Sequence, residues 1–155
     1  MRGYFGIGIY SPKTECNIGT LWRSAYQLGA SFIFTIAHRY KKQCSDTYKA
    51  YRYIPLIQFS NYENFISSPF YDCIVIAIDF NKNMDASFFV ELKNFHHPQR
   101  CMYLLGSEDN GLPEQIIRKS HYCIYIPSIR KESYNVSVAG SIVMYDRLMK
   151  GENNG

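Results

Sequence analysis

The sequence lacks any apolar run approaching the ~18 residues that a membrane-spanning helix requires. Its N-terminus carries one arginine and then the apolar stretch Tyr4–Tyr10, which glycines interrupt. That stretch is too short and too broken for a signal peptide. These absences favour a soluble protein with no membrane partner.

The five cysteines are odd in number and form no C-x-x-C pair. Cys73, Cys101 and Cys123 fall in apolar runs typical of buried strands, which predicts reduced, structural thiols and a cytoplasmic location. No ligand cluster suits zinc, so no metal is expected. The pair His96-His97 before Pro98 fits a polar helix end better than a ligand pair.

Nucleotide-binding and hydrolase signatures are also missing. The N-terminal glycines have the wrong spacing for G-x-G-x-x-G, and there is neither a Walker A lysine nor a nucleophile elbow. An ordinary Rossmann enzyme or α/β-hydrolase is therefore disfavoured.

What the sequence does contain is a core: hydrophobic residues make up 46%, enough for one folded domain of 155 residues. Apolar runs predict strands at 4–10, 31–37, 54–59, 73–80, 101–106 and 121–126. Helical patterns fill the gaps at 17–28, 61–66, 85–95, 113–119 and 135–149. This alternation predicts an α/β fold with a mainly parallel sheet, spanning residues 1–150, and a frayed tail at 151–155.

The net charge of +4 is too small to require a polyanionic partner, but its placement is uneven. A long connection between two predicted strands interleaves tyrosines with basic residues, which suits RNA phosphates and splayed bases. A solvated loop whose tyrosines pack on the sheet edge is the alternative. The candidate RNA-binding residues are Arg39, Lys41, Lys42, Lys49 and Arg52.

Three predicted strand-to-helix junctions are rich in polar groups: 17–23, 105–113 and 133–139. Such junctions present backbone N–H groups and polar side chains to a ligand, so together they suggest one assembled site. Each also has a plainer explanation. Asn17 suits a helix N-cap, Arg23 a surface salt bridge, Asn110-Gly111 a turn, and 133–137 the cap of the last helix.

In order and spacing, these junctions resemble the SpoU (TrmH-like) branch of the SPOUT-class RNA methyltransferases. The branch's patterns are N-x-G-x-x-x-R, then G-x-E-x-x-G-L after a strand, then I-P followed by S-x-N-x-S-x-A. The sequence matches them from Asn17 to Arg23, from Gly106 to Leu112, at Ile126-Pro127, and from Ser133 to Ala139.

The resemblance implies a parallel-sheet SPOUT fold whose C-terminal part is tied into a deep trefoil knot. It implies S-adenosylmethionine as the cofactor and a homodimer with the site at the interface, for which the first and last helices are candidates. The implied cofactor-binding residues are Ile78, Leu105, Gly106, Ile126, Ser133 and Asn135. The implied catalytic residues are Arg23, Asn17, Glu108, Ser133 and Asn135.

The implied reaction is methylation of a ribose 2′-hydroxyl in RNA, with tRNA favoured over rRNA because small members often act on tRNA. Arg23 would orient the hydroxyl and a phosphate, since a guanidinium stays protonated in proteins and is a poor base. Tyr134 and Ser128 depart from the usual Leu and Met, and both changes affect the pocket wall. A base methylase and a non-catalytic RNA-binding protein on the same fold are the alternatives.

Overall fold

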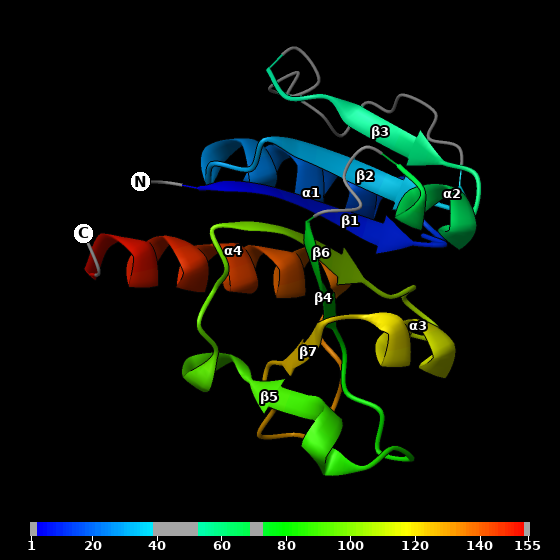
Figure 1. Ribbon diagram of the computed structural model, residues 1–155, viewed down its shortest axis with the longest axis vertical. Helices are drawn as coiled ribbons and strands as arrows, with labels where there is room; N and C mark the ends of the chain where they lie inside the picture. The colour runs from blue at the N-terminus through cyan, green and yellow to red at the C-terminus, as the bar shows by residue number, and fades with distance from the viewer. Residues whose placement is uncertain (1–2, 39–52, 69–72, 154–155) are drawn as a thin grey trace.

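The computed structural model describes residues 3–38, 53–68 and 73–153. Within them, seven strands form one parallel sheet in the order β3-β2-β1-β6-β4-β7-β5 (Figure 1). The strands are β1 (Tyr4–Tyr10), β2 (Phe32–Ile36), β3 (Leu56–Phe59), β4 (Ile74–Ile78), β5 (Phe89–Glu91), β6 (Arg100–Leu105) and β7 (Tyr122–Tyr125). The predicted α/β class and parallel sheet are confirmed.

Four α-helices cover both faces of this sheet: α1 (Glu15–Gln27), α2 (Tyr62–Ile66), α3 (Glu114–Lys119) and α4 (Val136–Asn153). Apolar residues of α1 and α4 form one core with inward residues of β1, β4 and β6. Residues of α2 and α3 form a second core with the opposite side chains of the same sheet and with two phenylalanines of β2. A sheet buried on both faces explains why its strands read as continuous apolar runs.

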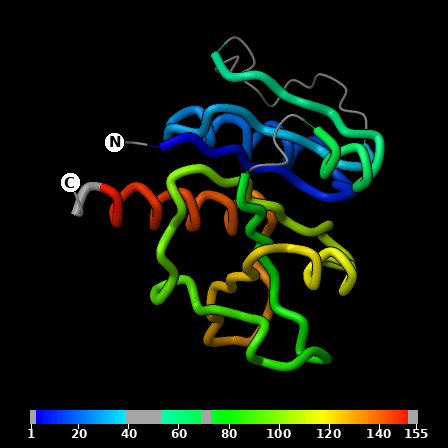
Figure 2. The backbone as a smooth tube through the Cα atoms, in the orientation of Figure 1, coloured from blue at the N-terminus to red at the C-terminus, as the bar shows by residue number. Residues whose placement is uncertain are grey.

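The chain crosses over between the two halves of the sheet. Strand β6 lies between β1 and β4, although β4 and β5 precede it in sequence (Figure 2). After β7 the chain returns to α4, which packs beside α1. Gly140 makes that packing possible, because a Cβ there would lie 2.6 Å from Leu21 and 3.1 Å from Leu105.

One predicted helix is wrong. In place of 85–95 the structure has a 3-10 turn (η2, Ala86–Phe88), strand β5, and a second 3-10 turn (η3, Leu92–Asn94). The Asp85 carboxylate accepts from the Ser87 N–H at 2.8 Å, but this cap serves only a single turn. Phe89 and Val90 favour strand geometry, and they pair with Cys123 and Ile124 at the sheet edge.

Two helix ends also differ from expectation. Helix α1 begins at Glu15 with Thr14 as its N-cap, so Asn17 lies inside the helix and is not the cap. Helix α4 continues to Asn153 and therefore includes the first part of the predicted tail. No helix in the described parts of the chain is long and apolar enough to cross a membrane.

A buried polar network fastens the second half of α4 to the sheet. His97 contacts the Tyr103 hydroxyl through Nδ1 at 2.6 Å and Asp146 through Nε2 at 2.7 Å. Arg147 donates to the Tyr103 oxygen at 3.2 Å, and Lys150 pairs with Asp146 at 2.8 Å. His97 is thus a buried anchor, not the polar helix end expected from sequence.

One arrangement of protons satisfies this network with a neutral imidazole: Tyr103 donates to Nδ1, and the Nε2–H donates to Asp146. Burial disfavours the charged imidazole, and this outweighs the attraction of Asp146. The pKa of His97 therefore lies below its ordinary value of 6.5.

Lowering the pH should destabilise the fold through His97. The unfolded chain protonates this residue more readily, so its contribution to stability is present above pH 6.5 and declines as pH falls toward the lowered pKa. Chemical denaturation of wild type and His97→Asn between about pH 7.5 and 5 measures the effect. The His97→Asn profile should be flatter, whereas exposed His96→Asn should follow wild type; parallel profiles for all proteins would contradict this account.

Candidate functional site

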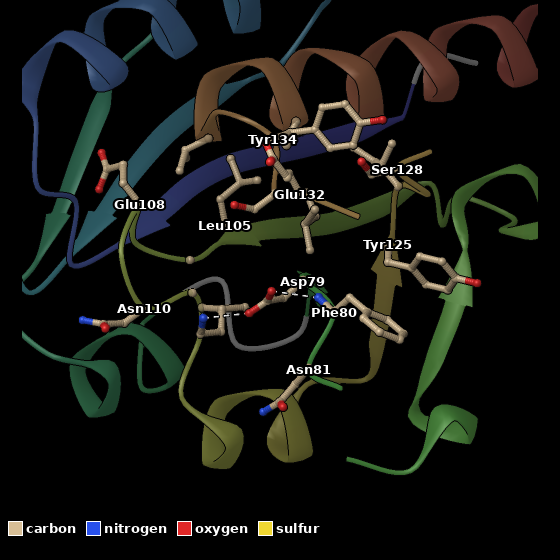
Figure 3. Close-up of a pocket in the computed structure, with 18 of the residues that line it drawn as sticks. Asp79, Phe80, Asn81, Leu105, Glu108, Asn110, Tyr125, Ser128, Glu132 and Tyr134 are labelled. Carbon is tan, nitrogen blue, oxygen red and sulfur yellow. Dashed lines mark hydrogen bonds between the residues drawn. The ribbon is translucent and has the colours of Figure 1, made fainter. Parts of the chain in front are cut away.

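A cavity of about 960 Å³ opens at the carboxyl ends of β4, β6 and β7 (Figure 3). Its walls come from the segments that follow these strands and from the start of α4, namely 78–83, 105–112, 125–128, 131–134, Val136 and Ala139. In parallel α/β sheets, ligands bind at this edge. The volume lies at the upper end of the range for ligand pockets, about 300–1,000 Å³.

Most of the predicted cofactor-binding residues lie on this cavity: Ile78, Leu105, Gly106, Ile126 and Ser133. They come from the ends of three different strands and from the loop before α4. Asn135 is the exception, since it does not line the cavity and caps α4 at its edge. The structure therefore brings most of this predicted set to one place.

The loop after β6 forms one wall and is tightly folded. The backbones of Ser107 and Gly111 bond to each other in both directions, at 3.3 and 3.0 Å, and the Ser107 hydroxyl accepts from the Asn110 N–H at 3.3 Å. A Cβ on Gly106 would collide with the backbone of Gly111. Glycine at 106 is therefore a steric requirement of the loop.

Asp79, directly after β4, holds this loop in place. One carboxylate oxygen accepts from the Leu112 N–H at 2.8 Å, and the other accepts from the Phe80 N–H at 2.7 Å (Figure 3). Sequence analysis missed this residue. A carboxylate immediately after a continuous apolar strand was the available signal, because such a group needs partners at the sheet edge.

Glu108, on the same loop, spans the gap to the N-terminus of α1. Its carboxylate accepts from the Asn17 amide at 2.8 Å and from the Lys13 N–H at 2.9 Å, and it lies near the Thr14 N–H and hydroxyl at 3.4 and 3.3 Å. Thr14 makes no capping bond with its own side chain. Glu108 thus supplies the negative charge that a helix N-terminus favours.

These bonds offset the cost of partial burial. Burial alone would raise the pKa of Glu108, but the donors from Asn17, Lys13 and Thr14 favour the carboxylate, and the pKa lies below its usual 4.5. The group is therefore an anion at neutral pH. Its bond to the Asn17 amide fixes the orientation of that amide.

Asn17 also contacts the third junction. Its side-chain oxygen accepts from the Asn135 amide at 3.1 Å, and the Asn135 oxygen accepts from the Ser137 N–H and hydroxyl at 2.9 and 2.6 Å. Glu108, Asn17 and Asn135 therefore form a continuous hydrogen-bonded chain. The polar junctions that the sequence predicted to meet lie together at one edge of the cavity.

Arg23 is half-buried on α1 and does not line the cavity. The predicted RNA-binding residues Arg39, Lys41, Lys42, Lys49 and Arg52 lie outside the described residues. The described residues include no group of three or more His, Cys, Asp and Glu side chains placed to hold a metal ion.

The loop before α4 is closed by Tyr134, one of the residues that depart from the family pattern. Its hydroxyl donates to the Pro127 carbonyl at 2.8 Å, across the base of the loop. Lys131 adopts a left-handed conformation, with φ of 58°, and its N–H donates to the Ser128 carbonyl at 3.1 Å. The Tyr134 side chain therefore fixes the loop that carries Ser133.

The model of the SpoU rRNA Methylase family matches residues 5–145. The chain belongs to this family. The match covers all three polar junctions, Asp79, which holds the loop after β6, and most of α4. No curated protein matches the chain.

Solved structures share the SpoU fold at low identity. An AdoMet-bound rRNA methyltransferase from Sinorhizobium meliloti has a TM-score of 0.80 and 22% identity, covering 97% of this chain and 57% of that one. A structure concerned with the 2-OH methylation of C/U34 on tRNA has a TM-score of 0.79 and 20% identity, covering 97% and 99%. The A. aeolicus TrmH/SpoU tRNA modifying enzyme has a TM-score of 0.83 and 18% identity, covering 100% and 78%. The chain thus spans little more than half of the S. meliloti protein.

Gly111→Ala should destabilise the protein more than Gly29→Ala does. Both glycines have positive φ, 63° and 89°, which costs an alanine about 1–2 kcal/mol. Only at Gly111 would the new Cβ crowd another group, the Asp79 carboxylate at 2.7 Å, and disturb its bond to Leu112. Urea denaturation should show a further loss of about 1–3 kcal/mol for Gly111→Ala. Equal losses would show that Asp79 does not hold the loop.

Glu108→Gln should lower the free energy of unfolding at neutral pH by about 1 kcal/mol, after allowance for solvent screening. Because the pKa of Glu108 is lowered in the folded protein, the carboxylate contributes its full stabilisation above pH 4.5. This stabilisation is lost as the pH falls further. Denaturation at pH 7 and at about pH 3 should therefore show the difference between wild type and variant shrinking in acid. Asp109→Asn on the same loop is the control, and an unchanged difference at both pH values would refute the assignment.

Proposed function

We propose that this chain is an S-adenosylmethionine-dependent RNA 2′-O-methyltransferase acting on tRNA. The observation that carries the proposal is the hydrogen-bonded chain of Glu108, Asn17 and Asn135 at the edge of the cavity. It joins the polar motifs of a methylase family beside a space that fits a cofactor and a nucleoside.

The cofactor would lie against Ile78, Leu105, Gly106 and Ile126, with Ser133 at the rim. These residues offer apolar walls and backbone groups at the strand ends, which suits an adenosine moiety. When bound, the cofactor supplies an activated methyl group. Asp79 ties together the segments after β4 and β6, and Tyr134 closes the loop before α4.

The ribose hydroxyl must be aligned with the methyl group and lose its proton during attack. In our proposal Arg23 orients the hydroxyl and a neighbouring phosphate through its planar fork of donors. Because Arg23 does not line the cavity of its own subunit, a second copy supplies it. Exposed apolar side chains on α4, Val138 and Tyr145, fit contact with that copy.

The preference for tRNA over rRNA rests on how fully this chain covers each of two similar structures. The structure concerned with methylation of C/U34 on tRNA matches this chain over nearly its full length, with 99% of that chain covered. The S. meliloti rRNA methyltransferase is much longer than this chain, with 57% covered. An rRNA ribose remains the second candidate, because the matching family is described by rRNA methylation.

We also propose that the C-terminal part of the chain is knotted. Strand β7 pairs with β4 on the side away from β6, and α4 then returns to pack beside α1. In our proposal, residues 126–135 thread past the connection between β4 and β5. A trefoil knot at this place would hold the cavity walls together without a disulfide.

Methyl transfer to tRNA should require Arg23. With labelled S-adenosylmethionine and a tRNA pool, nucleoside mass spectrometry should find a 2′-O-methylated ribose, and Arg23→Ala should reduce transfer by at least about 100-fold. Cofactor binding by Arg23→Ala should be unchanged, because Arg23 lies away from the cavity. Transfer to rRNA alone would overturn the substrate preference, and normal activity of Arg23→Ala would overturn its role.

Mixing variants tests whether the partner supplies Arg23. Ser133→Trp should place a large ring at the rim of the cavity and block cofactor binding in its own subunit. Arg23→Ala and Ser133→Trp proteins, each inactive alone, should regain activity when co-refolded, because one site in the mixed dimer has an intact cavity and the partner's arginine. If both act within one subunit, the mixture stays inactive.

A further inference from the structure

Two aromatic side chains lie on the cavity wall away from Glu108. The rings of Phe80 and Tyr125 lie 5.1 Å apart, and Phe80 also contacts the buried Phe89 at 5.0 Å (Figure 3). Phe80 remains 52% exposed despite these contacts. An apolar ring held half in solvent beside a ligand cavity offers an open face for stacking.

Phe80 is also firmly positioned. Its backbone N–H donates to Asp79, the same carboxylate that holds the loop after β6 through Leu112. Tyr125 is fixed at the end of β7, whose neighbouring strands are β4 and β5. The pair therefore needs little ordering on binding, which favours affinity.

Two cationic side chains lie on the same cavity, whose lining also carries the carboxylates of Asp79, Glu108, Asp109 and Glu132. Lys82 follows Phe80 on the segment after β4, and Lys131 lies on the loop before α4. Both are exposed. Ammonium groups next to an aromatic platform are the combination with which proteins hold single-stranded nucleic acid.

The cavity lining extends beyond the residues proposed for the cofactor. Those residues come from the ends of β4, β6 and β7 and from the rim at Ser133, whereas Phe80 and Lys82 lie farther along the segment after β4. The proposed cofactor contacts therefore leave Phe80 and Lys82 for a second ligand.

We propose that Phe80 and Tyr125 form a stacking platform for a nucleobase of the substrate RNA, with Lys82 and Lys131 contacting its phosphates. The inference rests on the proposed function and specifies where the RNA enters the site. An RNA base and the adenine of the cofactor are both aromatic heterocycles, and either could stack on this platform. The test therefore measures binding of RNA and of cofactor separately.

The experiment compares Phe80→Ala, Phe80→Trp and a matched control, Phe88→Ala. Phe88 is also exposed, at 40%, but it lies outside the cavity under Arg118. Affinity for an in vitro transcribed tRNA pool is measured by filter binding, and affinity for S-adenosylmethionine by calorimetry. Urea denaturation confirms that each variant is folded.

Phe80→Ala should weaken tRNA binding by roughly 5- to 150-fold, the range for loss of one stacked base. Phe80→Trp should retain binding, and Phe88→Ala should match wild type. Cofactor affinity should stay within about twofold in all variants.

A loss of cofactor affinity with unchanged tRNA binding would overturn the proposal and assign the platform to adenine. Unchanged affinity for both ligands would also overturn the proposal, and the Phe80 side chain would then serve only to pack against Phe89. The proposed function fails on a different measurement, namely if the wild-type protein transfers no methyl group. In that case the tRNA affinities of the variants still show whether the platform stacks a base.

Discussion

The carboxylate of Glu108 joins two parts of the molecule that are far apart in sequence, the loop after β6 and the N-terminus of α1. It accepts from Asn17 and from the backbone of Lys13, and Asn17 in turn bonds to Asn135 at the start of α4. The negative charge is stabilised where a helix presents unpaired N–H groups. Without this anion the loop after β6 would lose its bonds to the start of α1, while the other two polar junctions remain joined through Asn17 and Asn135.

The sheet topology decides where that cluster and the cavity lie. Placing β6 and β4 side by side brings the loops that follow them to one edge, and Asp79 ties those loops together. The second half of α4 is fastened by the buried network of His97, Asp146 and Tyr103. The helix that Asn135 caps is thus held at its start and in its second half, which keeps the Asn135 amide within reach of Asn17.

Much of this arrangement could be predicted from local sequence patterns. Continuous apolar runs identified the strands that are buried on both faces, and the polar residues after the strands pointed to segments that the fold brings to one cavity. The helix predicted at 85–95 is wrong because the acidic start of this segment resembles a helix cap. The segment instead forms a strand that pairs with β7, and this tertiary contact cannot be read from the local sequence. Asp79 was missed for the same reason: its partner Leu112 lies on a loop that only the fold brings close. That Arg23 does not line the cavity of the same subunit could not be predicted either, because it depends on how α1 packs in three dimensions.

The most direct test of the account is a double-mutant cycle between Glu108→Gln and Asn135→Ala, measured as free energies of unfolding. Glu108 and Asn135 do not bond to each other in this hydrogen-bonded chain, but each bonds to Asn17. The account predicts a coupling free energy of at least about 0.5 kcal/mol, because either change leaves Asn17 without a fixed orientation. Additivity within about 0.3 kcal/mol would contradict it and would show that the polar junctions act as independent caps.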